Sequence, residues 1–422
     1  MQRQSYCQFH SESLSKKMKV SPAKGHLALK SLFFVYYGGI GQFFAFLNIY
    51  YSSIGLSGVE IGVIGTLVSL IGIFSTTLWG MLSDKFGKPR WLFSIAFLGT
   101  ALGVLALSNV QTFSWIIVVA CLLNLFNMTL MPLLDSTALG LLGAESDRYG
   151  SYRVWGSLGF IAASTGVGFL YERIGLHSMF PIFIALMVIA MFISLVLPDL
   201  PVRLSGSPWG GLRQMVRKPR WVILASSAFF IWLAATAMLS FLGIMIKNMG
   251  GGDGLIGLSG TIAALVELPG MALGALMLSR IGASRMILLA CAGYTLRMFL
   301  YAIMPSPTWT LGISMLNSIT YVPFWLGAVA YAGELAPAEL KATSQGLLFS
   351  IMNLASMAGG LGSGWLFDSA GASGLFGVMA GCCLAALIIF AAGQAFLNKA
   401  EAALAQAPVE PAPAAVIDLR ES

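Results

Sequence analysis

Two ionisable side chains interrupt apolar stretches of this sequence. Glu267 lies in IAALVELPGMALGALMLSR (262–280), and Arg297 lies in ILLACAGYTLRMFLYAIM (287–304). A charge at the centre of a membrane helix costs roughly 2.5–3.5 kcal/mol, so such residues usually pair or face a water-filled cavity. We therefore expect Glu267 and Arg297 to form an ion pair near the membrane midplane, where Glu267 could bind and release protons. A structural ion pair that only fixes helix packing is the alternative.

A second pair of charges precedes these in the chain. Asp135 lies in MPLLDSTALGLL, and Arg153 lies in RYGSYRVWGSLGF. Arginine presents a rigid fork of donors that suits carboxylates and hydroxyl groups, and Phe160, two turns after Arg153, adds an aromatic face. We expect these three residues to bind a solute. The alternative is an interfacial Arg153 with Asp135 as its helix-end partner.

Uncharged polar residues within other apolar stretches are further candidates for the cavity lining. Each one is alternatively a hydrogen bond between packed helices. The residues proposed to line the cavity on this basis include Gln42, Asn124 and Tyr321.

The composition requires a membrane setting for these charges. Of 422 residues, 57% are hydrophobic and 10% are charged, and the mean hydropathy is +0.83. A soluble protein carries about 25% charged residues, so the chain is predicted to be an all-α integral membrane protein. Runs long enough to span a bilayer predict twelve helices, near 29–51, 58–82, 91–109, 112–142, 150–171, 177–197, 220–246, 255–279, 286–304, 309–333, 343–367 and 374–397.

The twelve predicted helices form two halves that repeat. GFLYERIG (168–175) is similar to GWLFDSAG (364–371), and MLSDKFGKPRW (81–91) is similar to LMLSRIGASRM (276–286), at nearly the same offset. Such a period indicates two pseudo-symmetric six-helix bundles. The predicted organisation is a tail at 1–28, bundles at 29–197 and 220–397, a central loop at 198–219 and a second tail at 398–422.

Basic residues predict the orientation. Successive connections between membrane helices lie on alternate sides of the membrane. Apart from Arg297, which lies within a helix, every Lys and Arg residue except Arg173 and Lys247 belongs to the side that includes both tails and the central loop. The positive-inside rule places that side, and both termini, in the cytoplasm. The rule also explains the net charge of +7. We therefore expect a multi-pass protein of a bacterial cytoplasmic membrane with no nucleic-acid partner.

The sequence offers little for catalysis. The cysteines have no spacing typical of a metal site or a disulfide framework, and no nucleophile–base pattern or phosphate-binding loop is present. We expect no enzyme activity, no metal and no cofactor.

The segment GMLSDKFGKPR (80–90) resembles the loop between helices 2 and 3 of the major facilitator superfamily. The resemblance implies twelve helices in two bundles that rock about a central cavity. It also implies a conformational latch at this loop, in which an aspartate clamps a neighbouring helix end. An ordinary turn with positive-inside charges is the alternative. The latch residues would be Gly80, Asp84, Lys85, Gly87 and Arg90.

Within that superfamily the chain resembles the lactose-permease-like proton symporters, and in particular the phenylpropionate-permease and nucleoside-permease types. MPLLDSTA followed by YGSYRVWGSLGF carries this resemblance, which places Asp135 and Arg153 at a sugar-binding pair and Phe160 at a stacking aromatic position. It links Arg297 to proton handling. Ser318 and Tyr321 stand where lactose permease has a histidine and a glutamate, so Glu267 is left to couple protons.

We therefore expect a monomeric secondary transporter that moves a sugar, a nucleoside or an aromatic acid by alternating access, with protons as the coupling ion. Uptake by symport is favoured over the first alternative, proton-driven efflux. A membrane sensor or scaffold with the same fold is the second alternative, and it predicts packed, dry charges with no cavity between the halves.

Overall fold

The protein is all helical in the part of the chain that the computed structural model describes, which is residues 22–86, 89–142, 149–198, 218–336 and 341–406. The first half contains α2 (Pro22–Ser53), α3 (Gly58–Phe86), α4 (Pro89–Leu107), α5 (Phe113–Leu142), α6 (Gly150–Ile174), the 3₁₀ turn η2 (Leu176–Ser178) and α7 (Met179–Ser194). The second half contains α9 (Pro219–Asn248), α10 (Asp253–Ile281), α11 (Ala283–Ala302), α12 (Trp309–Ser314), α13 (Asn317–Glu334) and α14 (Lys341–Gln406).

Eleven of the described stretches are long and apolar enough to cross a membrane. One of them, Ser344–Ala402, is interrupted at Gly371, whose φ of 68° is non-helical. This residue divides α14 into the two spans that the sequence predicts at 343–367 and 374–397. The predicted helix at 309–333 is formed by α12 and α13 in succession. The predicted multi-pass, all-α membrane fold is therefore confirmed.

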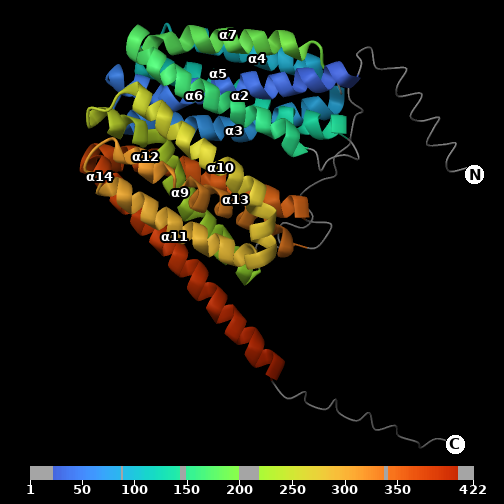
Figure 1. Ribbon diagram of the computed structural model, residues 1–422, viewed down its shortest axis with the longest axis vertical. Coiled ribbons are helices and arrows are strands. Elements are labelled where there is room, and N and C mark those ends of the chain that lie inside the picture. The colour runs from blue at the N-terminus through green and yellow to red at the C-terminus, as the bar shows by residue number, and fades with distance from the viewer. Residues whose placement is uncertain (1–21, 87–88, 143–148, 199–217, 337–340, 407–422) are drawn as a thin grey trace, which may run out of the picture.

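The helices form two bundles, α2–α7 and α9–α14, which lie one above the other in Figure 1. Within the first, α2 packs on α6 and α7, and α4 packs on α5 and α7; within the second, α14 packs on α9 and α11, and α13 packs on α10 and α11. The main contacts between bundles join α3 to α14, α6 to α10 and α2 to α9. The predicted domain limits, 29–197 and 220–397, stay predictions.

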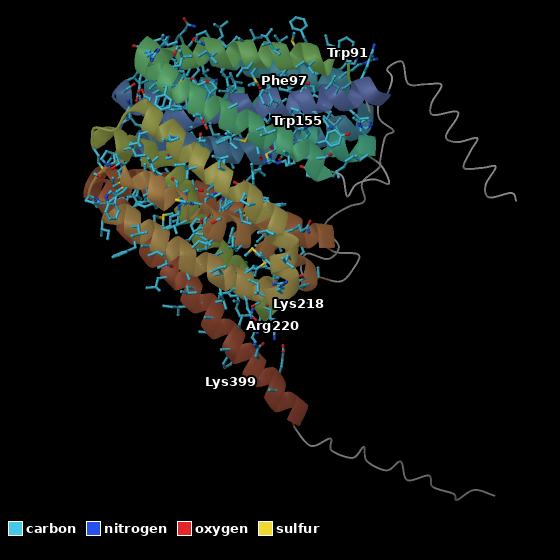
Figure 2. All side chains as sticks on the ribbon, in the orientation of Figure 1. Trp91, Phe97, Trp155, Lys218, Arg220 and Lys399 are labelled. Atoms are coloured by element: carbon cyan, nitrogen blue, oxygen red, sulfur yellow. The ribbon has the colours of Figure 1, made fainter. Side chains whose placement is uncertain are left out.

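Much of the outer surface is apolar, as a bilayer requires. Trp91, at the start of α4, and Trp155, near the start of α6, are 57% and 41% exposed. Figure 2 shows both on the bundle formed by α2–α7. Apolar side chains on this surface take the place that charged residues occupy in a soluble protein.

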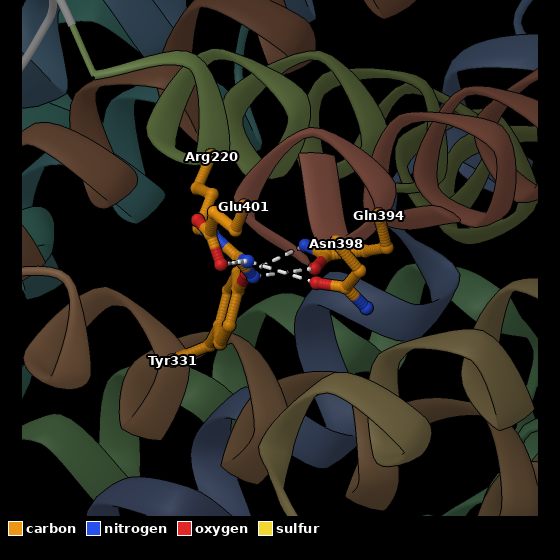
Figure 3. A network of polar contacts seen from close by, with 5 residues as sticks. All are labelled: Arg220, Tyr331, Gln394, Asn398 and Glu401. Carbon is orange, nitrogen blue, oxygen red and sulfur yellow. Dashed lines mark hydrogen bonds and ion pairs between the residues drawn. The ribbon is translucent and has the colours of Figure 1, made fainter. Parts of the chain in front are cut away.

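A polar network joins the beginning of α9, the first helix of the second bundle, to the last turns of α14, its final helix (Figure 3). Arg220, in the first turn of α9, donates to both carboxylate oxygens of Glu401 (3.1 and 2.7 Å) and to the side-chain oxygens of Gln394 (3.0 Å) and Asn398 (2.8 Å). Gln394 in turn donates to the Tyr331 hydroxyl (2.5 Å). The bidentate geometry is one that arginine forms with carboxylates, and it holds the last turns of α14 against the start of α9.

Glycine allows α2 and α6 to cross closely, which places Arg153 beside α2. A Cβ atom on Gly159 would lie 2.0 Å from the carbonyl oxygen of Phe34. Small residues at such crossings let helix backbones approach in a membrane, where packing drives association. The first bundle therefore depends on the absence of a side chain at position 159.

The substitution Gly159→Val is expected to destabilise the protein by about 1–3 kcal/mol, because the added atoms overpack the crossing. Thermal unfolding followed by intrinsic fluorescence in detergent measures the effect as a lower Tm. Gly166→Ala is the matched control on the same helix, since a Cβ atom there meets nothing within 4 Å. Equal Tm values for both variants would contradict the packing argument.

Candidate functional site

A cavity of about 370 Å³ lies between the two bundles. The first bundle lines it with Tyr37 and Ile40 of α2 and with Arg153, Ser157 and Phe160 of α6. The second bundle contributes residues of four helices, which are Trp232, Ala235, Met238, Leu239, Gly260, Ala263, Ala264, Glu267, Tyr294, Arg297, Asn317 and Tyr321. The volume falls within the range of small-molecule sites.

Contacts between the bundles close the molecule beyond one end of this cavity. The side chains of Ser164 and Thr165 share hydrogen bonds with Thr261 (2.9 and 2.6 Å), and Thr66 donates to the carbonyl of Met357 (2.9 Å). We call this the closed end; it holds the 53–58, 108–112, 249–252 and 303–308 connections and Gly371. The Asn48 side chain of α2 also donates across the interface, to the carbonyl of Ser240 in α9 (3.2 Å). The cavity therefore has one sealed end.

Arg153 lines the cavity from α6 and is held against an aromatic ring. Its guanidinium carbon lies 4.2 Å from the centroid of the Tyr37 ring, which is a cation–π distance. The ring belongs to α2, so the contact fixes the guanidinium without neutralising its charge. A cation positioned in this way can hydrogen-bond a solute.

Glu267 lines the same cavity from the second bundle. Arg153 lines it from the first bundle. The two side chains come from opposite bundles and are not joined by an ion pair, whereas Lys247 and Asp253 form one elsewhere in the described chain. The cavity thus separates a cation and an anion that belong to different halves of the protein.

The expected ion pair between Glu267 and Arg297 is not formed, and this corrects the prediction from sequence. Arg297 is 2% exposed, and it donates to the side-chain oxygens of Asn317 (2.8 Å) and Thr320 (3.2 Å). Asn317 donates in turn to the carbonyl of Ala263 (3.2 Å). Neutral acceptors on α13 therefore bond to Nη1 of the guanidinium, while the Glu267 carboxylate lines the cavity.

Phe160 and Tyr321 also line the cavity, as the sequence predicts. Gly41 of α2 makes room for Phe160, because a Cβ atom there would lie 2.9 Å from its ring. The Tyr321 ring stacks on Trp325 with centroids 5.9 Å apart. These two aromatic faces come from opposite bundles.

The other predicted binding residues lie outside the cavity lining. Asp135 accepts a hydrogen bond from the Tyr149 hydroxyl (2.7 Å) and forms no ion pair with Arg153 in the described structure. Asn124 donates to the carbonyl of Ala120 (2.9 Å). The Gln42 side-chain oxygen accepts from the Tyr171 hydroxyl. These contacts lie within the first bundle and away from the cavity lining, and the predicted binding role of the three residues stays a prediction.

The predicted conformational latch stays a prediction. Gly80, Asp84 and Lys85 lie toward the end of α3, at positions whose side chains are outside the described part of the chain. Gly87 is also outside the described residues. Arg90 lies in the first turn of α4 and its carbonyl accepts from the Ser94 hydroxyl (2.8 Å).

Helical spacing could have found several residues that the sequence argument missed. Ser157 lies between Arg153 and Phe160 at the spacing of one helix face, and Gly260, Ala263 and Ala264 share a face with Glu267 in the same way. Tyr37, Trp232 and Tyr294 give no such signal, because aromatic residues are common on every face of these helices. Within the described residues no cluster of His, Cys, Asp and Glu could hold a metal ion.

Comparison with known proteins decides the family. The profile of the MFS_1 like family matches residues 26–378, which is most of the chain. The chain belongs to this family. It is a membrane transporter of the major facilitator superfamily, and its relatives are permeases and transporters rather than enzymes.

Three curated relatives show how far the similarity extends. The maltose permease of Geobacillus stearothermophilus is 30% identical over 343 residues, covering 78% of this chain and 85% of the permease. The nucleoside permease NupG of Escherichia coli (strain K12) is 24% identical over 369 residues, with 80% and 87% covered. The probable 3-phenylpropionic acid transporter of the same strain is 23% identical over 376 residues, with 85% and 95% covered.

Solved structures give the same fold. A crystal structure of the nucleoside transporter NupG has a TM-score of 0.78 at 20% identity and covers 87% of this chain and 99% of its own. A bacterial homolog of the human lysosomal transporter Spinster, in an inward-facing and unoccupied conformation, has a TM-score of 0.66 at 14% identity, with 93% and 99% covered. The family resemblance and the fold class predicted from sequence are confirmed.

The substitution Asn317→Leu removes an acceptor from the buried Arg297. Hydrogen bonds to charged groups contribute about 1.5–3 kcal/mol, so Tm is expected to fall in detergent. Ser318→Ala is the neighbouring control, because that hydroxyl donates only to the carbonyl of Met315 in the preceding turn. A Tm for Asn317→Leu as high as that of the control would show that the guanidinium finds its acceptors elsewhere.

Proposed function

We propose that the protein imports a small hydroxyl-bearing solute, either a sugar or a nucleoside, together with protons. The observation that carries the proposal is the pair of opposite charges, Arg153 and Glu267, which line one cavity from separate bundles without an ion pair. A solute whose hydroxyl groups bond to both side chains would join the two bundles, and its release would free them. This is how binding is converted to rocking in alternating access.

The rest of the cavity fits the same class of solute. The aromatic faces of Phe160, Tyr321 and Trp232 can stack on the apolar face of a sugar ring or on a nucleobase, while charged groups bond to hydroxyls at the rim. The maltose permease and the NupG nucleoside permease named above transport solutes of these two classes. Protons are assigned to Glu267, which is the described carboxylate among the cavity residues.

The proposed orientation places the closed end outside the cell and both termini in the cytoplasm. The basic residues support it, since the positive-inside rule puts the segments at the other end in the cytoplasm. In this orientation the cavity is sealed from the exterior. The protein would act as a monomer, because one chain supplies all the residues that line the cavity.

The substitution Glu267→Gln tests the proton role. In proteoliposomes with maltose, uridine and 3-phenylpropionate as labelled solutes, uptake driven by a pH gradient is expected to fall at least about tenfold, while exchange of the same solute across the membrane persists. The amide cannot titrate but still hydrogen-bonds. Glu334→Gln, at an exposed carboxylate at the end of α13, is the control. Gradient-driven uptake that survives in Glu267→Gln would exclude this residue as the coupling group.

The substitution Arg153→Lys tests the solute role. Lysine keeps the charge but loses the planar stacking on Tyr37 and the fork of donors. The KM for the transported solute is expected to rise about tenfold, with a smaller change in maximal rate. Arg173→Lys, at an exposed position in the last turn of the same helix, is the control. Equal KM values for the two variants would place the solute away from Arg153.

A further inference from the structure

Two carboxylates cross the bundle interface at the closed end and have no part in the cavity. Glu172 lies near the end of α6, and Asp368 lies three residues before Gly371 in α14. Each accepts hydrogen bonds from backbone N–H groups at the beginning of a helix in the opposite bundle. The bonds are therefore made only while the two bundles are together at this end.

Asp368 binds the start of α3. Its Oδ1 accepts from the Gly58 N–H (2.7 Å), and its Oδ2 accepts from the Val59 N–H (2.8 Å). The first N–H groups of a helix have no acceptor within the helix, and they carry the positive end of the helix dipole. An anion from another element is suited to both features.

Glu172 binds the start of α10 in the same way. Its Oε1 accepts from the Gly254 N–H (2.9 Å). The neighbouring carboxylate, Asp253, forms an ion pair with Lys247 (2.8 Å). This pair offsets the negative charge that would otherwise oppose Glu172 at the helix end.

The internal repeat relates the two contacts. An offset of 196 residues takes Glu172 in GFLYERIG to Asp368 in GWLFDSAG, and it takes Gly58 to Gly254. The repeat that identifies the two halves thus carries a carboxylate and its N–H donor at equivalent positions in both. The same contact is made twice, once in each direction across the pseudo-twofold axis.

Glycine residues bring each carboxylate to its helix end. A Cβ atom on Gly364 would lie 2.2 Å from the carbonyl oxygen of Gly58, and one on Gly168 would lie 2.8 Å from that of Asp253. Gly168 and Gly364 are related by the same offset of 196. Backbone therefore meets backbone one helical turn before each carboxylate.

We propose that Glu172 and Asp368 form a paired latch that holds the closed end shut, and that both carboxylates leave their helix ends when the cavity opens toward that end. The latch deepens the proposed function, since it rests on alternating access. Separation exposes the carboxylates and the N–H groups to water, which hydrates both. The latch is therefore reversible, and its removal favours the state that is open at this end.

The distance between the bundles at the closed end tests the latch. Spin labels at Asn109→Cys and Thr308→Cys, two exposed positions in connections of opposite bundles, are placed in a background without the native cysteines. Electron–electron double resonance in lipid nanodiscs then measures closed and open populations without any solute. The double variant Glu172→Ala/Asp368→Ala is expected to raise the ratio of open to closed by at least about tenfold, because it removes charge-assisted hydrogen bonds.

Glu60→Ala is the matched control. Glu60 accepts from the backbone N–H (2.8 Å) and hydroxyl (3.1 Å) of Ser57 at the start of the same α3 helix, but within one bundle. Its removal is expected to leave the distances unchanged. If the alanine variants do not fold, Glu172→Gln/Asp368→Asn keeps the shape and removes the charge. If the distances in the double variant equal those in the parent, Glu172 and Asp368 do not hold the closed end shut. The proposed transport function would not be affected by that result.

Discussion

The constraint on which this structure depends is the cost of an unpaired charge within a membrane. Arg153, Glu267 and Arg297 are all within spans that lipid surrounds, and each is accommodated differently. Arg297 is buried among neutral acceptors, Arg153 lies on an aromatic ring, and Glu267 faces the cavity. Charged residues in membrane helices usually face the bundle interior or a water-filled cavity, and Glu267 and Arg153 both face the cavity between the bundles.

Small residues bring the two bundles into close contact, because packing drives helix association in a membrane. Gly62, Gly360 and Gly364 bring α3 and α14 into contact, and Gly257 brings α10 against α6. At these positions the backbone of one bundle lies directly against the backbone of the other. The crossings inside a bundle, such as Gly159 on Phe34, use the same chemistry to give a rigid unit. Close packing at glycine thus occurs both inside a bundle and between the bundles, and hydrogen bonds to Asp368 and Glu172 accompany it at the closed end.

Sequence reasoning predicted the helices well, because apolar runs and short polar connections are local properties of the chain. It located Gly371 inside a repeat, and it placed Glu267 and Arg297 at similar depth. It wrongly predicted an ion pair between them. The rotation of α10, α11 and α13 in the bundle decides which of their faces meet, and the sequence does not give this rotation. Gln42 and Asn124 are also used locally: the Gln42 side-chain oxygen accepts from the Tyr171 hydroxyl of a neighbouring helix, and Asn124 donates to the carbonyl of Ala120 in the preceding turn of its own helix. Tyr37 was missed because its importance comes from Arg153, 116 positions later in the sequence.

The central claim is that the two bundles enclose a water-accessible cavity whose access alternates between the two sides of the membrane. Ser157→Cys places one thiol in that cavity, and its reaction with a membrane-impermeant maleimide can be followed in right-side-out and inside-out vesicles. The account predicts fast reaction from the cytoplasmic side at rest, and reaction from the outer side in the double variant that lacks Glu172 and Asp368. A thiol that stays unreactive from both sides in every variant would contradict the account, and would favour a packed membrane scaffold over a transporter.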